Sequence, residues 1–307
     1  MENTCHYVCS RGLLKSCHIH SPAPQSSCNT DKQYLLDIIQ KKVHVFDGMS
    51  IYVCSDLLSF FVAYILPYIR NKFTLVSGDS DMCVPLEALN EQLSNILITN
   101  PYLIKWYAQN TRIQNDNKIV QLPIGLDYHT ILNNPRHNWK SNNEGHLPSQ
   151  QETILQNIKT LSKPFYERKL TNVYINFTLN ADRFGQRKDA LNKIPKHLLH
   201  YNSNFTKRTQ LWKEMSNFAF ILSPFGVGMD CHRTWEALIL GCIPIVKATN
   251  FTSMFKDLPV LIVSDWTEIT PELLANTISN FKNLHLTNKF NYDKLTLSYW
   301  TNLINNK

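Results

Sequence analysis

The chain has 307 residues, of which 43% are hydrophobic and 18% charged, and its formal net charge is +7. This composition excludes a disordered chain and is typical of one large globular domain or two domains of ordinary size. The positive charge is dispersed, without a basic stripe interleaved with aromatic residues. It therefore suits an anionic small-molecule substrate, and we expect no nucleic-acid partner.

The sequence predicts no membrane span and no secretory signal. Its longest apolar stretch, residues 57–69, contains Pro67 and is shorter than the roughly 20 residues that cross a bilayer. The first residues lack the apolar run of a signal peptide. The cysteines at positions 54, 231 and 242 lie in apolar contexts typical of core residues in a reducing compartment. We therefore expect a cytoplasmic protein.

Residues 1–30 are rich in Ser, Pro, Cys and His and show no periodicity, so we expect an irregular N-terminal extension. Thiol and imidazole side chains are also the ligands that zinc prefers, which leaves a zinc site as the alternative. The side chains available for it are Cys5, His6, Cys9, Cys17, His18, His20 and Cys28. Their spacing matches no standard zinc module, and we predict no metal there.

From Asp31 onward, segments of strand character alternate with segments of helical pattern. The expected strands are 43–46, 50–53, 73–76, 104–107 and 120–124, and the expected helices are 34–39, 56–68 and 85–97. Such alternation predicts α/β structure, a parallel sheet with helices on its faces. Ligands then bind beyond the carboxyl ends of the strands.

Several polar residues directly follow predicted strands and are candidates for chemistry. They are Asp79, Asp81, Asp127 and His129. The D-x-D pattern of Asp79 and Asp81 could hold Mn²⁺ or Mg²⁺ through oxygen ligands, although Gly-Asp-Ser is also a natural turn sequence. Gly125 and Asp127 could likewise serve only to shape their turn.

The polar stretch 133–150 predicts a crossover between two domains, followed by a helix that ends near residue 161. Residues 173–177 are expected to form the first strand of the second domain. The loop after it contains Arg183 and Arg187, which could reach phosphate groups or could form a solvated basic turn.

Residues 218–263 have the pattern of a βαβ unit. An apolar strand, 218–222, leads through Gly226 and Gly228 to a helix expected at 231–240, with Asp230 as its N-cap, and two further strands follow. The free N–H groups at the start of such a helix form an anion site.

His232 and Arg233 lie in the first turn of that helix, and Glu236 lies one turn further on the same side. A cation beside free N–H groups suits a diphosphate, and a carboxylate one turn deeper suits the hydroxyls of a ribose. The alternative is an ordinary surface ion pair between Arg233 and Glu236. We expect Trp235 to belong to the core.

Four segments carry a resemblance to a known family: SPFGVGMDCHRTWEALILGCIPIVK, LPVLIVSDWTEIT, YERKLTNVYINFTLNADRFGQRKDAL and KIVQLPIGLDYHT. The first two resemble the C-terminal signature of exostosin-like glycosyltransferases, glycosyltransferase family 47 in the broad sense. The chain looks most similar to those of large DNA viruses, which would place it in the host-cell cytoplasm. The resemblance covers roughly residues 118–270 and is thin before them.

The resemblance implies a GT-B fold, in which two Rossmann-like domains face a cleft. We expect an acceptor domain at 31–145, a nucleotide-sugar domain at 146–285, and a C-terminal helix at 286–307 that crosses back to the first domain. The implied reaction moves a sugar, with inversion, from a nucleotide-sugar donor (a UDP-sugar) to an oligosaccharide or glycan acceptor. No cofactor is required, although Mn²⁺ or Mg²⁺ remains possible. The expected donor-binding residues are Gly226, Gly228, His232, Arg233, Glu236, Arg183 and Arg187.

Inverting transfer needs a general base for the acceptor hydroxyl. Among the four residues that follow predicted strands we favour Asp79, with Asp127 next. The alternative function is a catalytically silent nucleotide-sugar-binding module or partner subunit. A dinucleotide oxidoreductase is disfavoured, because the glycine turn lacks a third glycine and no acidic residue ends the following strand.

Overall fold

The computed structural model describes residues 2–22, 31–113, 117–201 and 206–305. The protein is a mixed α/β structure with two parallel sheets, and its chain divides into two compact units. The N-terminal unit comprises Glu2–Thr4, Val8–Ile124 and Leu297–Lys307, and the C-terminal unit comprises Cys5–Tyr7 and Gly125–Thr296. In the described part of the chain, no helix has the length and apolarity needed to cross a membrane.

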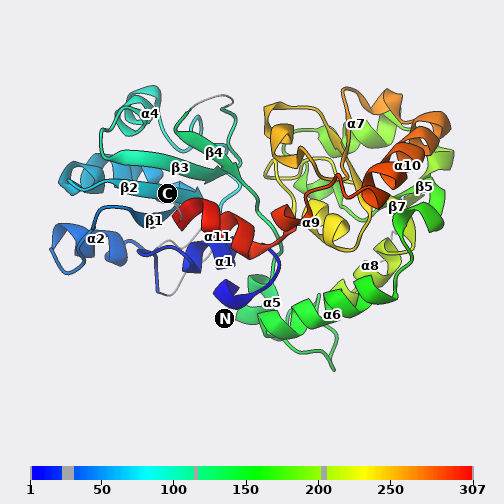
Figure 1. Cartoon of the computed structure of the whole chain (residues 1–307), viewed down its shortest axis with the longest axis horizontal. Helices are drawn as coiled ribbons and strands as arrows, with labels where there is room; N and C mark the ends of the chain where they lie inside the picture. Colours follow the sequence, from blue (N-terminus) through cyan, green and yellow to red (C-terminus); the bar gives the residue numbers. More distant parts are fainter. Residues whose placement is uncertain (1, 23–30, 114–116, 202–205, 306–307) are drawn as a thin grey trace. The chain divides into compact units, whose positions relative to one another are not determined.

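The N-terminal unit is built on a four-stranded parallel sheet whose strands lie in chain order (Figure 1). These strands are β1 (Met49–Cys54), β2 (Phe73–Gly78), β3 (Leu103–Gln109) and β4 (Ile119–Leu122). All six residues of β2 are buried, as expected for a strand with neighbours on both sides and side chains covered on both faces. Its helices are α1 (Ser10–Lys15), α2 (Gln33–Ile39), α3 (Leu58–Phe60), α4 (Glu91–Ile98) and α11 (Leu297–Asn305).

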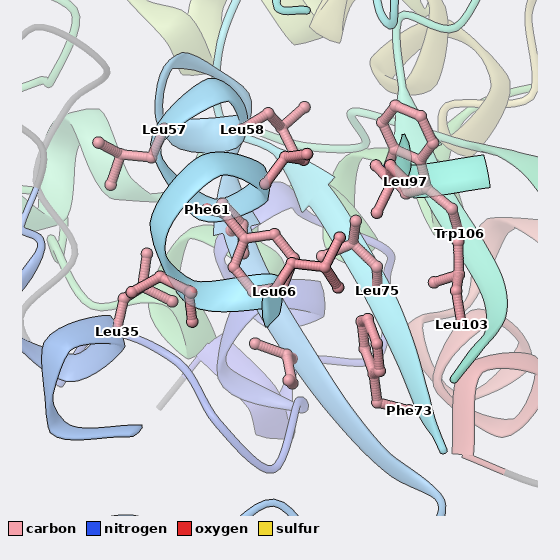
Figure 2. Packing of buried hydrophobic residues seen from close by; sticks show 14 of the residues in the cluster. Leu35, Leu57, Leu58, Phe61, Leu66, Phe73, Leu75, Leu97, Leu103 and Trp106 are labelled. Carbon is pink, nitrogen blue, oxygen red and sulfur yellow. The ribbon is translucent and has the colours of Figure 1, made fainter. Parts of the chain in front are cut away.

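The helical segment at 55–68 supplies much of this unit's core. Figure 2 shows Phe61 and Leu66 packing toward β2, where the rings of Phe61 and Phe73 lie 6.2 Å apart. The segment is not the single α-helix expected at 56–68, because 3-10 turns flank α3 and a π turn at Phe61–Ile65. Pro67 lacks an N–H and its ring crowds the carbonyl four residues back, so a regular ladder cannot continue through it.

Two other expected elements differ from the structure. Residues 43–46 form no strand, because the N–H groups of Lys42 and Val43 donate to the Asp37 carbonyl and finish α2. The helix expected at 85–97 begins only at Glu91, where the Asn90 side chain caps it by accepting the Leu93 N–H at 2.8 Å.

Residues 2–22, expected to be an irregular extension, instead contribute to the folded core. Leu13 and Leu14 of α1 are buried. Helix α11 lies beside α1 (Figure 1), and its Trp300 is buried as well. Tyr107 of β3 donates its hydroxyl to the Leu303 carbonyl at 2.6 Å. These contacts place the C-terminal helix in the N-terminal unit. Among the described residues, no group of three or more His, Cys, Asp or Glu side chains could hold a metal, while Cys28 lies outside them.

The C-terminal unit is built on a five-stranded parallel sheet of order β6-β5-β7-β8-β9. The strands are β5 (Lys169–Ile175), β6 (Leu199–Tyr201), β7 (Phe218–Leu222), β8 (Ile243–Lys247) and β9 (Leu261–Val263). The helices are α5 (His129–Asn133), α6 (Pro148–Leu161), α7 (Gln186–Lys193), α8 (Arg208–Met215), α9 (His232–Ile239) and α10 (Pro271–Leu286). The long helix α10, which the sequence patterns did not single out, packs against β5.

The chain passes from one unit to the other after Ile124, about 20 residues before the crossover expected near residue 145. The reason is a set of contacts that the segment after β4 makes with later helices. Arg208 of α8 donates to the Asp127 carbonyl, and Glu152 of α6 accepts the Tyr128 hydroxyl at 3.0 Å. Polar side chains therefore hold residues 125–133 in the C-terminal unit.

Candidate functional site

The strand order of the C-terminal unit identifies one edge of its sheet as the place for a ligand. The connection after β5 leads to β6 on one side, whereas the connection after β7 leads to β8 on the other side. In open parallel sheets, ligands bind beyond the carboxyl ends of strands at such a reversal. The candidate site is therefore formed by the loop after β5, the loop after β7 and the start of α9.

Arg187 joins the two loops. Its side chain donates from Nε to the Phe225 carbonyl at 3.2 Å and from Nη1 to the Thr178 carbonyl at 2.7 Å, and the residue is only 6% exposed. A Cβ on Gly226 would lie 2.4 Å from Arg187 Nη2, so glycine is the residue that this approach allows. The Gly226 N–H donates to the Gly228 carbonyl at 3.1 Å. Both glycines therefore shape the loop that precedes α9.

Arg233 lies in the first turn of α9 with part of its charge unmatched. Its guanidinium lies 5.2 Å from the ring centroid of Phe177, and that of Arg187 lies 5.4 Å from the same ring. Arg233 Nη1 is buried without a hydrogen-bond partner. Burial lowers the pKa of Arg233, and the nearby Arg187 lowers it further. The Cys231 thiol and Glu236 act in the opposite direction and offset part of this effect. A buried N–H donor without an acceptor costs free energy of folding, and a bound anion would supply the missing acceptor.

The start of α9 is not capped by its N-cap side chain. Cys231, the N-cap residue, makes no side-chain cap hydrogen bond, so it satisfies none of the first-turn N–H groups. Asp230, expected to be the N-cap, instead accepts the Trp235 Nε1–H with both carboxylate oxygens, at 3.0 and 2.9 Å. Trp235 is fully buried, which confirms its assignment to the core. Glu236 lies one turn deeper and is 8% exposed.

Arg183, the other arginine of the loop after β5, has an exposed side chain stacked 5.3 Å from the ring of Phe184. Its backbone N–H donates to the Gly226 carbonyl at 3.3 Å. The structure thus brings this loop against the loop after β7, with the Arg183 side chain at the surface.

His232 connects α9 to the segment that follows β4. Its Nδ1 lies 2.7 Å from the Gly125 carbonyl oxygen. Because a carbonyl only accepts, Nδ1 carries the proton, and Nε2 of the neutral ring bears the lone pair. The His129 ring lies 6.4 Å away between centroids. Gly125 adopts a φ of 65°, a conformation that glycine takes at little cost.

Asp127, one of the two favoured bases, is held in a buried ion-pair cluster. Its Oδ2 lies 3.3 Å from Arg208 Nη2, and its Oδ1 lies 3.2 Å from His129 Nδ1 and accepts the Thr130 N–H at 2.9 Å. Burial alone would raise the pKa of Asp127, but His129, Arg208, His232 and the Thr130 N–H together hold it well below its usual range. A carboxylate so stabilised is a poor proton acceptor.

Asp79, the other favoured base, belongs to the N-terminal unit and follows β2. It forms a two-point ion pair with Arg11 of α1, at 3.1 Å and 3.3 Å, and Arg11 is only 3% exposed. Asp81, its partner in the D-x-D pattern, is exposed. The Ser80 hydroxyl accepts the Met82 N–H at 3.2 Å, an interaction typical of a turn.

Asp79→Ala should therefore destabilise the protein by about 3 kcal/mol, because it leaves the Arg11 guanidinium buried without its carboxylate. Asp81→Ala, the matched exposed change, should alter stability by no more than about 0.5 kcal/mol. Urea denaturation of both variants measures the difference. Equal midpoints for Asp79→Ala and the wild type would show that the ion pair contributes nothing to the fold.

Three residues important to these clusters were not among the sequence candidates: Phe177, Arg208 and Arg11. Phe177 was assigned to a strand and Arg11 to the irregular extension, and Arg208 was given no role. The only sequence signal for Phe177 is a weak one, an aromatic residue next to a basic loop. Nothing local marks the two arginines, whose partners lie 81 and 68 residues away.

Comparisons with known proteins add little. No protein-family model and no curated protein matches the chain. The N-terminal domain of Candida albicans trehalose-6-phosphate phosphatase matches 95% of this chain and 79% of its own, with 12% identity and a TM-score of 0.43. A GtfA/B complex matches 80% of this chain and 56% of its own, with 10% identity and a TM-score of 0.26. Both similarities are weak.

Proposed function

We propose that the chain is a glycosyltransferase that takes its sugar from a nucleotide-sugar donor. The observation that carries the proposal is Arg233, whose Nη1 is buried and unpartnered at the uncapped start of α9. This start lies at the reversal of strand order, where a parallel sheet binds ligands. A diphosphate would accept from Nη1 and from the first-turn N–H groups together.

The remaining donor-site residues take roles that follow from their contacts. Arg187 and Gly226 hold the two loops together, Gly228 continues the turn, and Glu236 meets the ribose hydroxyls. As the sugar leaves, negative charge builds on the diphosphate, and Arg233 with the α9 N–H groups stabilises it. One such preorganised donor is worth roughly 3 kcal/mol of barrier. Arg183, at the surface of the loop after β5, reaches the outer phosphate.

The finer assignments rest on the resemblance of residues 118–270 and on the presence of two parallel sheets. They are membership of the exostosin-like glycosyltransferases, a GT-B fold, a UDP-sugar as donor, a glycan as acceptor, and inversion at the anomeric carbon. Two parallel sheets are what two Rossmann-like domains require.

Thermal melting with a panel of nucleotides and nucleotide sugars tests the proposal, with Mn²⁺ and with EDTA in parallel. A ligand that binds only the folded state raises the melting temperature by mass action. We expect a shift with UDP and with one UDP-sugar that is indifferent to EDTA. A shift that requires Mn²⁺ would bring the D-x-D residues forward as ligands, and no shift with any nucleotide would contradict the donor site.

Glu236→Ala should weaken binding of UDP and of uridine by about tenfold, the loss expected when one or two hydrogen bonds to a carboxylate disappear. It should leave the affinity for inorganic pyrophosphate unchanged, because the carboxylate faces the ribose in the proposed complex. Glu272→Ala on α10, an exposed glutamate, is the matched control. Calorimetric titration of the three ligands decides, and unchanged uridine binding would remove Glu236 from the site.

One observation favours a second candidate function, a catalytically silent nucleotide-sugar-binding module. Both favoured bases, Asp79 and Asp127, are engaged in buried ion pairs. Release of UDP from a UDP-sugar by the isolated protein would exclude the silent module, whereas binding without any turnover would favour it.

A further inference from the structure

His129 lies within ion-pair distance of a carboxylate that is itself fixed. Its Nδ1 lies 3.2 Å from Asp127 Oδ1, and Arg208 lies 3.3 Å from the other carboxylate oxygen. The side chains of Asp127 and Arg208 are each 7% exposed, whereas that of His129 is 22% exposed. The histidine is thus the accessible member of a buried, charged cluster.

The carboxylate also determines which ring nitrogen can take up a proton. An ionised carboxylate only accepts, so it favours the tautomer of His129 with the proton on Nδ1 and the lone pair on Nε2. When Nε2 gains a proton, the imidazolium that forms lies beside Asp127, which remains ionised. A carboxylate at this distance stabilises the charged form of a histidine base.

This cluster lies next to the proposed donor site and within the same unit. The His129 ring lies 6.4 Å from that of His232, the residue before Arg233 on α9. His232 is anchored to the Gly125 carbonyl, not to a carboxylate. The Asp127 carboxylate lies 3.2 Å from Nδ1 of His129 and would compensate a positive charge on that ring.

We propose that His129 is the general base of the transfer reaction and that Asp127, held by Arg208, is its positioning residue. The assignment rests on the proposed function and names the proton acceptor of that same site. The acceptor hydroxyl gives its proton to His129 Nε2 while its oxygen bonds to the anomeric carbon. The bond from that carbon to the diphosphate breaks, and its electron pair leaves with the nucleoside diphosphate. His129 then releases the proton to solvent.

The first test is the tautomer of His129 in the full chain, measured by long-range ¹⁵N–¹H NMR on protein labelled at histidine nitrogen. His129→Gln and His232→Gln identify the two rings by loss of their signals. We expect neutral His129 to carry its proton on Nδ1 with Nε2 unprotonated. A neutral ring protonated on Nε2 would overturn the proposal.

The second test is release of UDP from a panel of UDP-sugars with water as acceptor. His129→Gln should lower turnover by about 100-fold or more, the usual contribution of general-base catalysis. Its affinity for UDP should stay within about twofold of the wild type, because the base does not hold the diphosphate. His197→Gln, an exposed histidine of the same unit, should match the wild type in both measurements.

The pH profile separates a base from a structural residue. The groups that face His129 include Asp127, at 3.2 Å, and the ring of His232, at 6.4 Å between centroids. Turnover by the wild type should fall as the pH decreases, which gives the pH–rate profile an acidic limb. The profile of His129→Gln should lack this limb, and Asp127→Asn should shift it along the pH axis.

The outcomes distinguish the two proposals. If the wild type does not bind UDP, the proposed function fails. If it binds UDP and releases it from a UDP-sugar, but His129→Gln does so at the wild-type rate, only the assignment of the base is overturned. If it binds UDP without turning over any donor, the silent module is favoured and the base assignment is also overturned.

Discussion

Arg233→Met should lose most of the affinity for UDP while raising the melting temperature of the unliganded protein. Hydrogen bonds to a charged donor are worth about 1.5–3 kcal/mol, so UDP affinity should fall by roughly 10- to 100-fold. Binding of uridine, which has no phosphate, should change little. Calorimetric titration of both ligands against wild type and variant measures this difference.

The gain in stability has the same origin as the loss in binding. Arg233 Nη1 is buried without a partner, and a thioether of similar length removes that cost while keeping contact with Phe177. We expect the melting temperature to rise by a few degrees, since about 1 kcal/mol corresponds to roughly 2–4 °C in a domain of this size. Such a trade between stability and function is typical of binding sites.

Arg136→Met, which changes an exposed arginine of the same unit, serves as the control and should alter neither quantity. Equal losses of UDP and uridine affinity would show that Arg233 does not contact the diphosphate. A lower melting temperature for Arg233→Met would show that its guanidinium already has a stabilising partner in the free protein.

Asp127→Ala should destabilise the protein by about 3–5 kcal/mol, because it leaves the buried Arg208 guanidinium without its carboxylate. The double change of Asp127→Asn with Arg208→Met should recover part of this loss, since it removes the charge as well as its partner. Urea denaturation at neutral pH measures both. If the double variant is less stable than Asp127→Ala, the cost does not arise from an uncompensated charge.

The same pair makes a predictable contribution to the pH dependence of stability. The folded-state pKa of Asp127 lies well below its usual range, so the folded protein binds this proton less readily than the unfolded chain. The contribution is therefore complete above the unfolded pKa of about 3.9 and is lost as the pH falls from there toward the folded pKa. The Asp127→Asn variant should lack this component of acid destabilisation.

The elements of the C-terminal unit were largely predictable. The strand expected at 218–222 has these bounds in the structure, and the helix expected at 231–240 differs from α9 by one residue at each end. One prediction within this unit was wrong: Asp230 was expected to be the N-cap of α9, and it does not cap the helix. A short polar residue before a helix usually caps it, but here the indole N–H of Trp235 takes both of its oxygens.

The candidate site was predictable in its location and not in its chemistry. Residue spacing suggested an anion site at the start of α9, with Arg233 and Glu236 on one side of the helix. It could not separate a surface ion pair from an arginine with a buried, unpartnered Nη1, because that depends on the ring of Phe177 and on the position of Arg187. Both belong to the β5–α7 region, more than 40 residues earlier in the chain.

What the sequence by itself determined is most of the strands of the two sheets and the helix α9, because their periodicity and end signals depend on neighbouring residues. Only the tertiary structure decided the order of strands in each sheet, and with it the reversal between β5 and β7 that locates the site. It also decided which carboxylates are available for chemistry, since Asp79 and Asp127 are matched by arginines far away in sequence. Pairing of this kind depends on contacts between distant segments, and no local pattern of residues encodes it.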